Sequence, residues 1–191
     1  MVQTEELIEI LKKLRDEKKN NFGRTVPLGD LIFDRWEAAK FLQFGEQTSI
    51  YDSSLVLGDV KVGRDTWIGP FTVLDGSGGG LSIGDHCSIS AGVHIYTHDT
   101  VKNCVSGGKL PYEYAPVHIG NCCYIAPRAL ISKGVTLGSH CIVCTGSFVN
   151  KSYEDFSILA GTPAEKIGHV ILRGEEVELV YYHKKGYFCR E

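Results

Sequence analysis

One histidine stands where its side chain could remove a proton from a bound molecule. His98 follows Ile95, Tyr96 and Thr97 and precedes Asp99, at the point where a run of regularly spaced apolar residues ends and a loop begins. Imidazole has an unperturbed pKa of about 6.5 and can accept a proton near neutral pH, an effect worth roughly 10²- to 10⁴-fold in rate. Asp99, or a carboxylate from elsewhere in the chain, would orient the ring. We expect His98 to be a catalytic base, and the alternative is a solvated loop histidine.

The seven cysteines lack the spacing of a metal site. Cys141 and Cys144 form a single Cys-x-x-Cys pair, and no second pair is present to complete a set of four ligands. Cys87, Cys123 and Cys141 each occupy the fifth position of a six-residue repeat, where small residues recur. A buried cysteine packs as a small hydrophobic residue. We therefore interpret these three as core filler and predict no metal site.

The six-residue repeat determines the elements that hold these side chains. Apolar residues recur at this spacing in three runs: Ile50, Val56, Val62, Ile68 and Leu74; Ile83, Ile89 and Ile95; and Ile119, Ile125, Ile131, Leu137, Val143 and Val149. This period fits neither an α-helix nor a simple alternating strand, and it is typical of a parallel β-helix. Three hexapeptides make a triangular coil of about 18 residues, and coils stacked at a strand spacing of about 4.8 Å bury one apolar residue per face.

Two interruptions divide the repeat. Residues 76–80 are rich in glycine and add three positions between Leu74 and Ile83, which predicts a small bulge. The pattern then fades at about residues 99–116 and returns in register, which predicts an excursion loop. We expect a mainly β fold in which residues 46–168 form the β-helix domain.

The first 45 residues have a different pattern. Residues 4–19 have the acidic start and the apolar stripe of an amphipathic helix. A second short helix is expected at about residues 34–43, with Trp36 and Phe41 buried. We predict an N-terminal helical segment at residues 1–45.

The other end of the chain predicts a hairpin. Two apolar runs between residues 170 and 182 flank the turn-forming sequence Arg-Gly-Glu-Glu. Such a hairpin would cap the open end of the stacked coils, an edge that natural sheets tend to cover. Residues 169–191 are therefore expected to form a C-terminal hairpin followed by a tail.

Composition excludes several classes of partner. The chain has 191 residues and a formal net charge of -3, without the basic excess typical of nucleic-acid-binding proteins. No apolar stretch approaches the roughly 20 residues needed to span a bilayer, and the charged start lacks the apolar core of a signal peptide. We expect a cytoplasmic protein without nucleic-acid or membrane partners.

Four segments in the second half of the chain resemble one family. They are Pro-Val-His-Ile-Gly-Asn at 116–121, Lys-Gly-Val-Thr-Leu-Gly at 133–138, Gly-Ser-Phe-Val-Asn-Lys at 146–151 and Ala-Gly-Thr-Pro-Ala at 160–164. In this order they are similar to the hexapeptide-repeat acyltransferases. The similarity is greatest to the branch of galactoside and maltose O-acetyltransferases and of surface-polysaccharide sugar acetyltransferases, and it covers about residues 50–168.

This resemblance implies a left-handed β-helix that acts as a homotrimer, with active sites between subunits and acetyl-CoA as the acetyl donor. It implies transfer to a hydroxyl or amino group of a sugar. We favour a sugar of lipopolysaccharide, capsule or related glycan synthesis, with nucleotide-linked sugars among the candidates. His98 stands where similar enzymes place a catalytic histidine that assists direct attack on the thioester, and His140 is a second candidate base.

The resemblance also implies two sets of binding residues. The set expected to bind the cofactor is Tyr124, Thr145, Gly146, Lys151 and Lys166. The set expected to bind the acceptor is Asp75, Lys109, Tyr112 and Tyr114. The two cofactor lysines would face phosphates, and backbone N–H groups near Thr145 and Gly146 would hold the thioester carbonyl or a pantetheine amide. Glu165 stands where many relatives have a cation, so the chain departs from the family pattern at this position.

Two other classes of function stay open. A zinc-dependent β-helix of the carbonic anhydrase kind needs three histidines that converge on the metal. The available histidines are His86, His94, His98, His118 and His140. A non-enzymatic β-helix would bind no CoA. The Gly-Thr-Pro-Ala sequence and the loop after His98 favour the acyltransferase interpretation.

Overall fold

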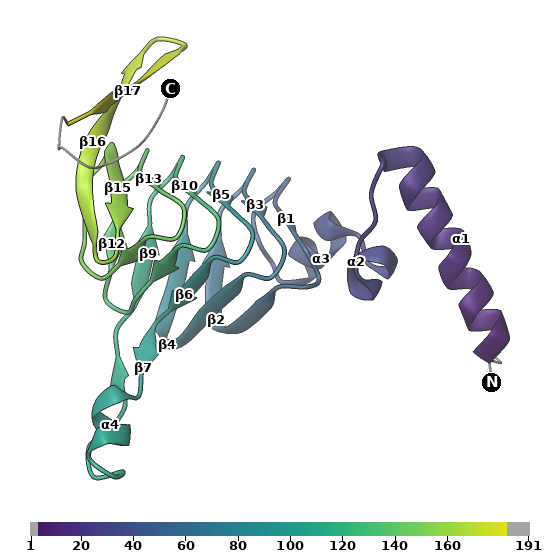
Figure 1. Ribbon diagram of the computed structural model, residues 1–191, viewed down its shortest axis with the longest axis horizontal. Helices are drawn as coiled ribbons and strands as arrows, with labels where there is room; N and C mark the ends of the chain where they lie inside the picture. Colours follow the sequence, from purple (N-terminus) through teal and green to yellow (C-terminus); the bar gives the residue numbers. More distant parts are fainter. Residues whose placement is uncertain (1–3, 183–191) are drawn as a thin grey trace.

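The computed structural model describes residues 4–182, and its body is a parallel β-helix (Figure 1). The strands of the coils are β1 Ser49–Ile50, β2 Leu55–Val62, β3 Trp67–Ile68, β4 Val73–Ile83, β5 Ser88–Ile89, β6 His94–Tyr96, β9 Val117–Ile119, β10 Tyr124–Ile125, β11 Leu130–Ile131, β12 Thr136–Leu137, β13 Ile142–Val143 and β14 Phe148–Val149. They pair in parallel in an order that skips along the sequence, as stacked coils require. The predicted mainly β fold is confirmed, and its handedness stays a prediction.

Two sheets form the sides of the coils. One contains β1, β3, β5, β10 and β13 in that order and continues into the carboxy-terminal strands. The other has the order β12, β9, β4, β6, β11 and β14, with β2 paired to β4. The eleven-residue strand β4 runs through a corner, because its first part pairs with β6 and its last part with β9. The second sheet therefore supplies two sides of the triangular coil.

Hydrogen bonds between stacked turns give the length of each coil. Asn121 N donates to Ser139 Oγ, 18 positions further along the chain. The step is 21 positions from Arg64 N to Asp85 Oδ1, because the glycine-rich segment lies within it. It is 36 positions from Asp85 N to Asn121 Oδ1, because the excursion lies within it. Both predicted interruptions of the repeat are confirmed.

The apolar repeat residues fill the inside of the coils. Ile68, Ile89, Ile125 and Val143 stack along the first sheet with no exposed surface. Complete burial of such a side chain contributes about 1.5–3 kcal/mol relative to exposure. Because every coil repeats this burial against its neighbours, the stack supplies one continuous core.

Three cysteines line one corner of this core. Cys87, Cys123 and Cys141 are buried, and each thiol donates to a turn carbonyl of the next coil at 3.1–3.2 Å. The pKa of Cys123 is raised, first of all by its hydrogen bonding with Cys141 and Cys87 and also by burial. A small side chain with a weakly donating thiol suits this corner of the core, so the interpretation of these three cysteines as core filler fits the structure.

Three helices precede the coils: α1 Thr4–Phe22, α2 Leu28–Ile32 and α3 Arg35–Phe41. The predicted amphipathic helix is present as α1, which leads away from the body in Figure 1 and buries none of its residues. The short helix α2 was not predicted, and it begins directly after Pro27. Proline is tolerated at the start of a helix, where its missing N–H has no partner to lose. Within residues 4–182, none of the helices combines the length and apolar composition needed to cross a bilayer.

The predicted second helix is present as α3, but the predicted burial of its aromatic residues is wrong. Trp36 is 48% exposed and Phe41 is 87% exposed, whereas Ala39 is buried in the core. Asp34 caps the helix by accepting hydrogen bonds from Trp36 N and Glu37 N. A helix of seven residues presents one narrow face to the coils, and the small Ala39 occupies that face.

Three antiparallel strands close the carboxy-terminal end of the coils. They are β15 Ser157–Gly161, β16 Ala164–Arg173 and β17 Glu176–Tyr181, and they extend the first sheet beyond β13. The predicted hairpin is confirmed, with Leu172 paired to Val177 near its turn. The predicted tail from residue 184 lies outside the described residues.

Candidate active site

The excursion leaves the coils directly after β6. It contains β7 His98–Asp99, the short helix α4 Val101–Val105 and β8 Glu113–Tyr114, and it projects from the side of the β-helix in Figure 1. Strands β7 and β8 pair in antiparallel fashion, with His98 opposite Tyr114. The chain thus returns to the coils beside the point where it left. His98 is therefore held at the junction between a rigid coil and a projecting segment.

The carboxylate beside the His98 ring is that of Asp75. Asp75 Oδ2 lies 2.8 Å from His98 Nδ1, and the two side chains are 1% and 31% exposed, respectively. Asp75 belongs to β4, where it pairs with Tyr96 of the next coil. The sequence predicts that Asp75 contacts an acceptor and that Asp99, or a carboxylate from elsewhere in the chain, orients the ring. The structure instead places Asp99 away from His98, because consecutive residues of a strand point to opposite faces.

Backbone and hydroxyl groups hold the Asp75 carboxylate in place. Its Oδ1 atom accepts hydrogen bonds from the N–H and the hydroxyl of Ser77, and the Ser77 hydroxyl also lies 3.5 Å from His98 Nδ1. The buried Thr97 hydroxyl donates to Asp75 O at 2.8 Å and accepts from Gly78 N at 2.7 Å. A side chain at Gly78 would meet the Thr97 carbonyl oxygen at 2.2 Å, so this close approach of two strands requires glycine.

This geometry suits proton transfer. With Asp75 accepting a hydrogen bond from Nδ1–H, the neutral imidazole of His98 carries its lone pair on Nε2. The buried carboxylate then stabilises the positive ring that forms when Nε2 takes a proton. The Asp75 carboxylate is therefore placed to orient the His98 ring, an arrangement in which Nε2 could act as a base.

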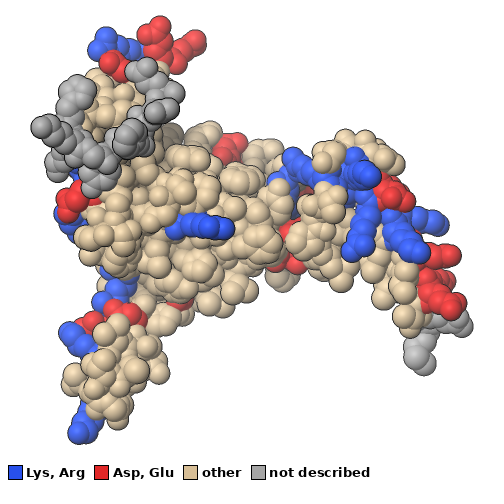
Figure 2. Space-filling view, viewed as in Figure 1, with Lys and Arg blue, Asp and Glu red and all other residues tan. Residues whose placement is uncertain are grey.

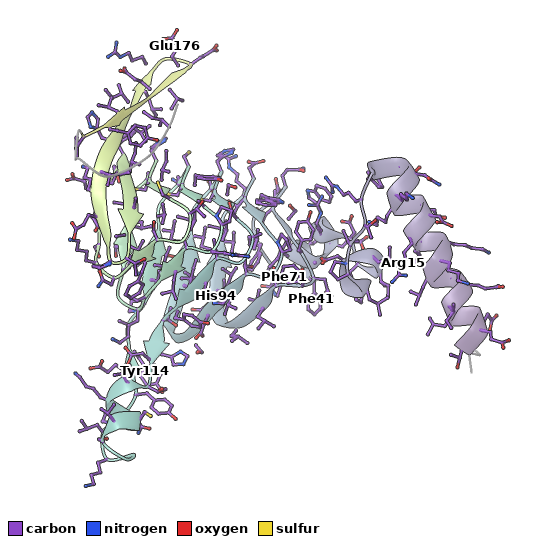
Figure 3. All side chains as sticks on the ribbon, in the orientation of Figure 1. Arg15, Phe41, Phe71, His94, Tyr114 and Glu176 are labelled. Atoms are coloured by element: carbon purple, nitrogen blue, oxygen red, sulfur yellow. The ribbon has the colours of Figure 1, made fainter. Side chains whose placement is uncertain are left out.

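Two exposed tyrosines of the excursion lie near this pair. The Tyr114 ring is 6.2 Å from the His98 ring, and the Tyr112 ring is 6.4 Å from that of Tyr114. Figure 3 shows Tyr114 at the base of the excursion, next to the coils. Lys109 is exposed between α4 and β8. The predicted acceptor set is thus divided, since Asp75 lies beneath His98 whereas the other three residues lie on the excursion.

Asp99 belongs to a separate group of charges. Lys133, in the turn after β11, lies 2.8 Å from Asp99 Oδ2 and 3.3 Å from Glu113 Oε2. Hydrogen bonding to Lys133 lowers the pKa of Asp99, whereas the pKa of Glu113 is lowered first by Lys102 and then by Lys133. A carboxyl group with a lowered pKa keeps its negative charge until the pH falls through that lowered value. These ion pairs are therefore intact at neutral pH.

The cofactor set lies elsewhere on the chain. Tyr124 is 45% exposed on β10 of the first sheet, and Thr145 is exposed in the turn between β13 and β14. Gly146 N donates to Pro127 O at 3.0 Å, so this N–H is already used within the coils and is not available to a thioester oxygen. The oxyanion role expected for the Gly146 amide is therefore not supported, while the role of Thr145 stays a prediction.

Both lysines expected to bind phosphate have carboxylate partners. Lys151 Nζ lies 3.1 Å from each carboxylate oxygen of Glu165, and Lys166 Nζ lies 2.6 Å from Glu154 Oε1. Each carboxylate raises the pKa of its lysine, which stays positive at neutral pH. A phosphate bound by these lysines would have to replace or share those partners.

The remaining histidines are dispersed. His140 stacks on Phe156 with ring centroids 4.8 Å apart, and His118 Nδ1 lies 2.7 Å from Ser82 Oγ. Across residues 4–182, no three histidine, cysteine, aspartate or glutamate side chains converge as a set of metal ligands. The zinc interpretation therefore has no ligand set in the described part of the chain. The role of His140 as a second base stays a prediction.

Sequence reasoning missed two residues that organise this region. Ser77 supports Asp75 from within the glycine-rich bulge, where it reads as an ordinary turn residue. Lys133 reaches the excursion from a coil turn, and its residue type alone gives no sign of this contact. The pairing registers of β4 with β6 and of β7 with β8 bring these side chains together. From the sequence, only the coil length derived from the repeat could have revealed these contacts.

Comparison with known proteins gives similar proteins at modest identity. No family model matches the chain. The carnitine operon protein CaiE of Escherichia coli is 28% identical over 126 residues, which cover 63% of this chain and 64% of CaiE. Galactoside O-acetyltransferase of Escherichia coli is 27% identical over 112 residues, which cover 54% of this chain and 53% of that enzyme. The chain thus spans less than two thirds of the length of these curated relatives.

A solved structure is similar over a comparable part of the chain. A variant of AntD, an N-acyltransferase from Bacillus cereus in complex with dTDP and coenzyme A, superimposes with a TM-score of 0.60 at 26% sequence identity. The match covers 66% of this chain and 72% of that protein. In its six-residue repeat and its stacked parallel coils, and by its likeness to these relatives, the chain is similar to the hexapeptide-repeat acetyltransferases.

Proposed function

We propose that this protein transfers an acetyl group from acetyl-CoA to a hydroxyl or amino group of a sugar, with His98 as the general base. The single observation that carries this proposal is the contact of His98 Nδ1 with the buried Asp75 carboxylate at 2.8 Å. A partly exposed imidazole held in one tautomer has the arrangement needed to deprotonate an acceptor. The binding of coenzyme A and dTDP by AntD supports a CoA donor and a nucleotide-linked acceptor.

The residues of this chain would contribute as follows. Bound acetyl-CoA would supply an electrophilic thioester carbonyl and a thiolate leaving group. His98 Nε2 takes a proton from the acceptor hydroxyl or amine. The acceptor oxygen or nitrogen bonds to the carbonyl carbon as this proton leaves, and the carbon–sulfur bond breaks. Asp75 stabilises the resulting imidazolium, which then returns its proton to the departing sulfur. The acetyl group therefore passes directly to the acceptor, without an acyl-enzyme intermediate.

Some of the described residues have side chains suited to binding acetyl-CoA. Tyr124 offers an exposed aromatic face on the first sheet, and Lys151 and Lys166 offer ammonium groups near the carboxy-terminal end of the coils. Both ammonium groups are paired with single, exposed carboxylates. Phosphate oxygens accept the same charge-assisted hydrogen bonds, so a bound phosphate would replace or share these carboxylates.

We further propose that the active site is shared between copies in a homotrimer. Asp75 belongs to the second sheet, whereas Tyr124 belongs to the first. Among residues 4–182, no hydrogen bond, ion pair or ring contact joins the His98 group to the cofactor set. A seam between two subunits would bring the first sheet of one copy next to the excursion of another.

Two inactive variants can test the shared site. His98→Ala and Tyr124→Asp copies are expected to be inactive alone, and mixed trimers refolded or co-expressed from both should regain part of the activity. Light scattering should give three chains per particle. A monomer in solution, or mixed particles that stay inactive, would contradict a site shared between copies.

An acetyl-CoA assay tests the activity itself. Release of free thiol would be measured with a panel of nucleotide-linked amino sugars and free glycosides, using wild-type protein and His98→Ala. We expect at least one sugar to stimulate thiol release by wild type, with the rate lowered about 10²- to 10⁴-fold in the variant. Equal rates for the two proteins would reject His98 as the base, and absence of CoA binding would reject the transferase proposal.

A further inference from the structure

The projecting excursion has a short attachment to the coils. Strands β7 and β8 contribute two residue pairs, His98 with Tyr114 and Asp99 with Glu113. An isolated hairpin is marginally stable even when longer than this. Ala115 N adds one hydrogen bond to Thr97 O at 2.9 Å. The segment from residue 98 to residue 114 is here called the arm. Because its attachment is short, further contacts must help to keep the arm in one orientation.

The second residue pair of this attachment carries two negative charges. Asp99 and Glu113 lie directly opposite each other across the two strands, and like charges at such positions are destabilising. The pair therefore needs a cation between its carboxylates for the arm to hold this register.

Lys133 supplies that cation from the body of the β-helix. Its Nζ atom lies 2.8 Å from Asp99 Oδ2 and 3.3 Å from Glu113 Oε2, and its side chain is 23% exposed. Lys102 of α4 contacts the other Glu113 oxygen, but it belongs to the arm itself. Figure 2 shows charged groups of both signs at the junction of arm and body. Lys133 is thus the cation that ties both strands of the arm to a coil turn.

We propose that Lys133 is a positioning residue that fixes the arm relative to His98 and so shapes the acceptor side of the active site. The proposal rests on the proposed function of His98 as the base. Tyr114 is the residue through which Lys133 acts, because its ring stands 6.2 Å from that of His98 and its strand neighbour Glu113 contacts Lys133.

The expected kinetic effect of a change at Lys133 depends on which contacts remain when the arm loosens. Asp75 belongs to β4, and His98 is the first residue of the arm, two positions after the end of β6, so we expect the Asp75–His98 contact to remain when the rest of the arm loosens. Lys133→Met keeps the length and apolar stem of the side chain and removes its charge. We expect the KM for the acceptor to rise about tenfold, while kcat changes less than threefold and the KM for acetyl-CoA stays unchanged. Lys133→Arg keeps the charge and should restore most of the acceptor affinity.

A double variant separates repulsion from simple loss of a contact. In Lys133→Met the Asp99 and Glu113 charges face each other without a shared cation. Adding Glu113→Gln removes one of those charges, so Lys133→Met/Glu113→Gln should bind the acceptor better than Lys133→Met alone. A matched control is Lys61→Met, since Lys61 forms an exposed ion pair with Asp59 within β2 and neither residue belongs to the arm.

Hydrogen exchange gives a readout that does not depend on catalysis. Peptides from the arm should exchange faster in Lys133→Met than in wild type, Lys133→Arg or Lys61→Met, while peptides from the coils exchange at the same rate in all four. Unchanged exchange in the arm, or a fall in kcat with constant acceptor KM, would overturn the proposal. Because exchange is measured without substrate, this test separates failure of the Lys133 proposal from failure of the proposed function.

Discussion

Replacement of Asp75 by asparagine tests the candidate catalytic pair. Asp75→Asn keeps the side-chain volume at a site that is 1% exposed but replaces the carboxylate that accepts from His98 Nδ1. The asparagine amide can donate to Nδ1 instead, which places the ring proton on Nε2 and removes the base from the acceptor side. We therefore expect kcat to fall while the binding of acetyl-CoA is unchanged.

The size of this effect follows from the lost contact. A hydrogen bond to a charged group contributes about 1.5–3 kcal/mol, and about 1.4 kcal/mol corresponds to a factor of ten in rate. The loss predicts a decrease in kcat/KM of roughly 10- to 150-fold. The corresponding change in a Ser–His–Asp triad costs about 10⁴-fold. Because His98 is 31% exposed, water can partly replace the carboxylate, and we expect about 10²-fold.

A double-variant cycle distinguishes orientation of His98 from contact with the acceptor. If Asp75 acts through His98, adding Asp75→Asn to His98→Ala should change kcat/KM less than threefold. Asp59→Asn, an exposed change on the neighbouring strand β2, is the control and should leave the rate unchanged. Thiol release with a competent acceptor is the assay. Full additivity of the two changes, or a decrease of less than threefold for Asp75→Asn alone, would refute the reasoning.

Three further predictions concern the same structure. Nitrogen NMR of neutral His98 should show the proton on Nδ1 in wild type and on Nε2 in Asp75→Asn, and a wild-type proton on Nε2 would contradict the assigned pairing. A thiol reagent should label the exposed Cys104 quickly and the buried Cys123 only on unfolding, and rapid labelling of Cys123 in native protein would show that the coils open readily. Ile125→Ala should lower the free energy of unfolding by about 2–5 kcal/mol in urea titrations, and a change below about 1 kcal/mol would mean that this ladder does not form the core.

The sequence repeat predicted the coils well because each hexapeptide buries one apolar residue in the same way. Ile68, Ile89 and Ile125 illustrate this, since their spacing alone determines that they stack. The prediction failed at α3, where Phe41 was expected inside and is 87% exposed. A short helix outside the repeat has no periodic partner that reveals which of its faces is covered.

The candidate site was predicted in part. His98 was proposed because the repeat ends beside it and because similar enzymes place a histidine there, but its partner was named only as Asp99 or a carboxylate from elsewhere in the chain. Asp75 lies one widened coil away, and its pairing with Tyr96 depends on the three residues added by the glycine-rich bulge. The hydrogen bonds of Gly146 and the contacts of Lys133 also depend on long-range register, which side-chain types alone do not reveal.

A single-turnover experiment tests the central claim most directly. Wild-type protein and His98→Ala would each be loaded with acetyl-CoA, with the Kd measured in parallel, and then mixed with the best acceptor from the sugar panel. We predict Kd values within threefold of each other and transfer at least about 10²-fold slower in the variant. Transfer at the same rate in both proteins, or wild-type protein that does not bind acetyl-CoA, would contradict the assignment of His98 as the base of an acetyltransferase.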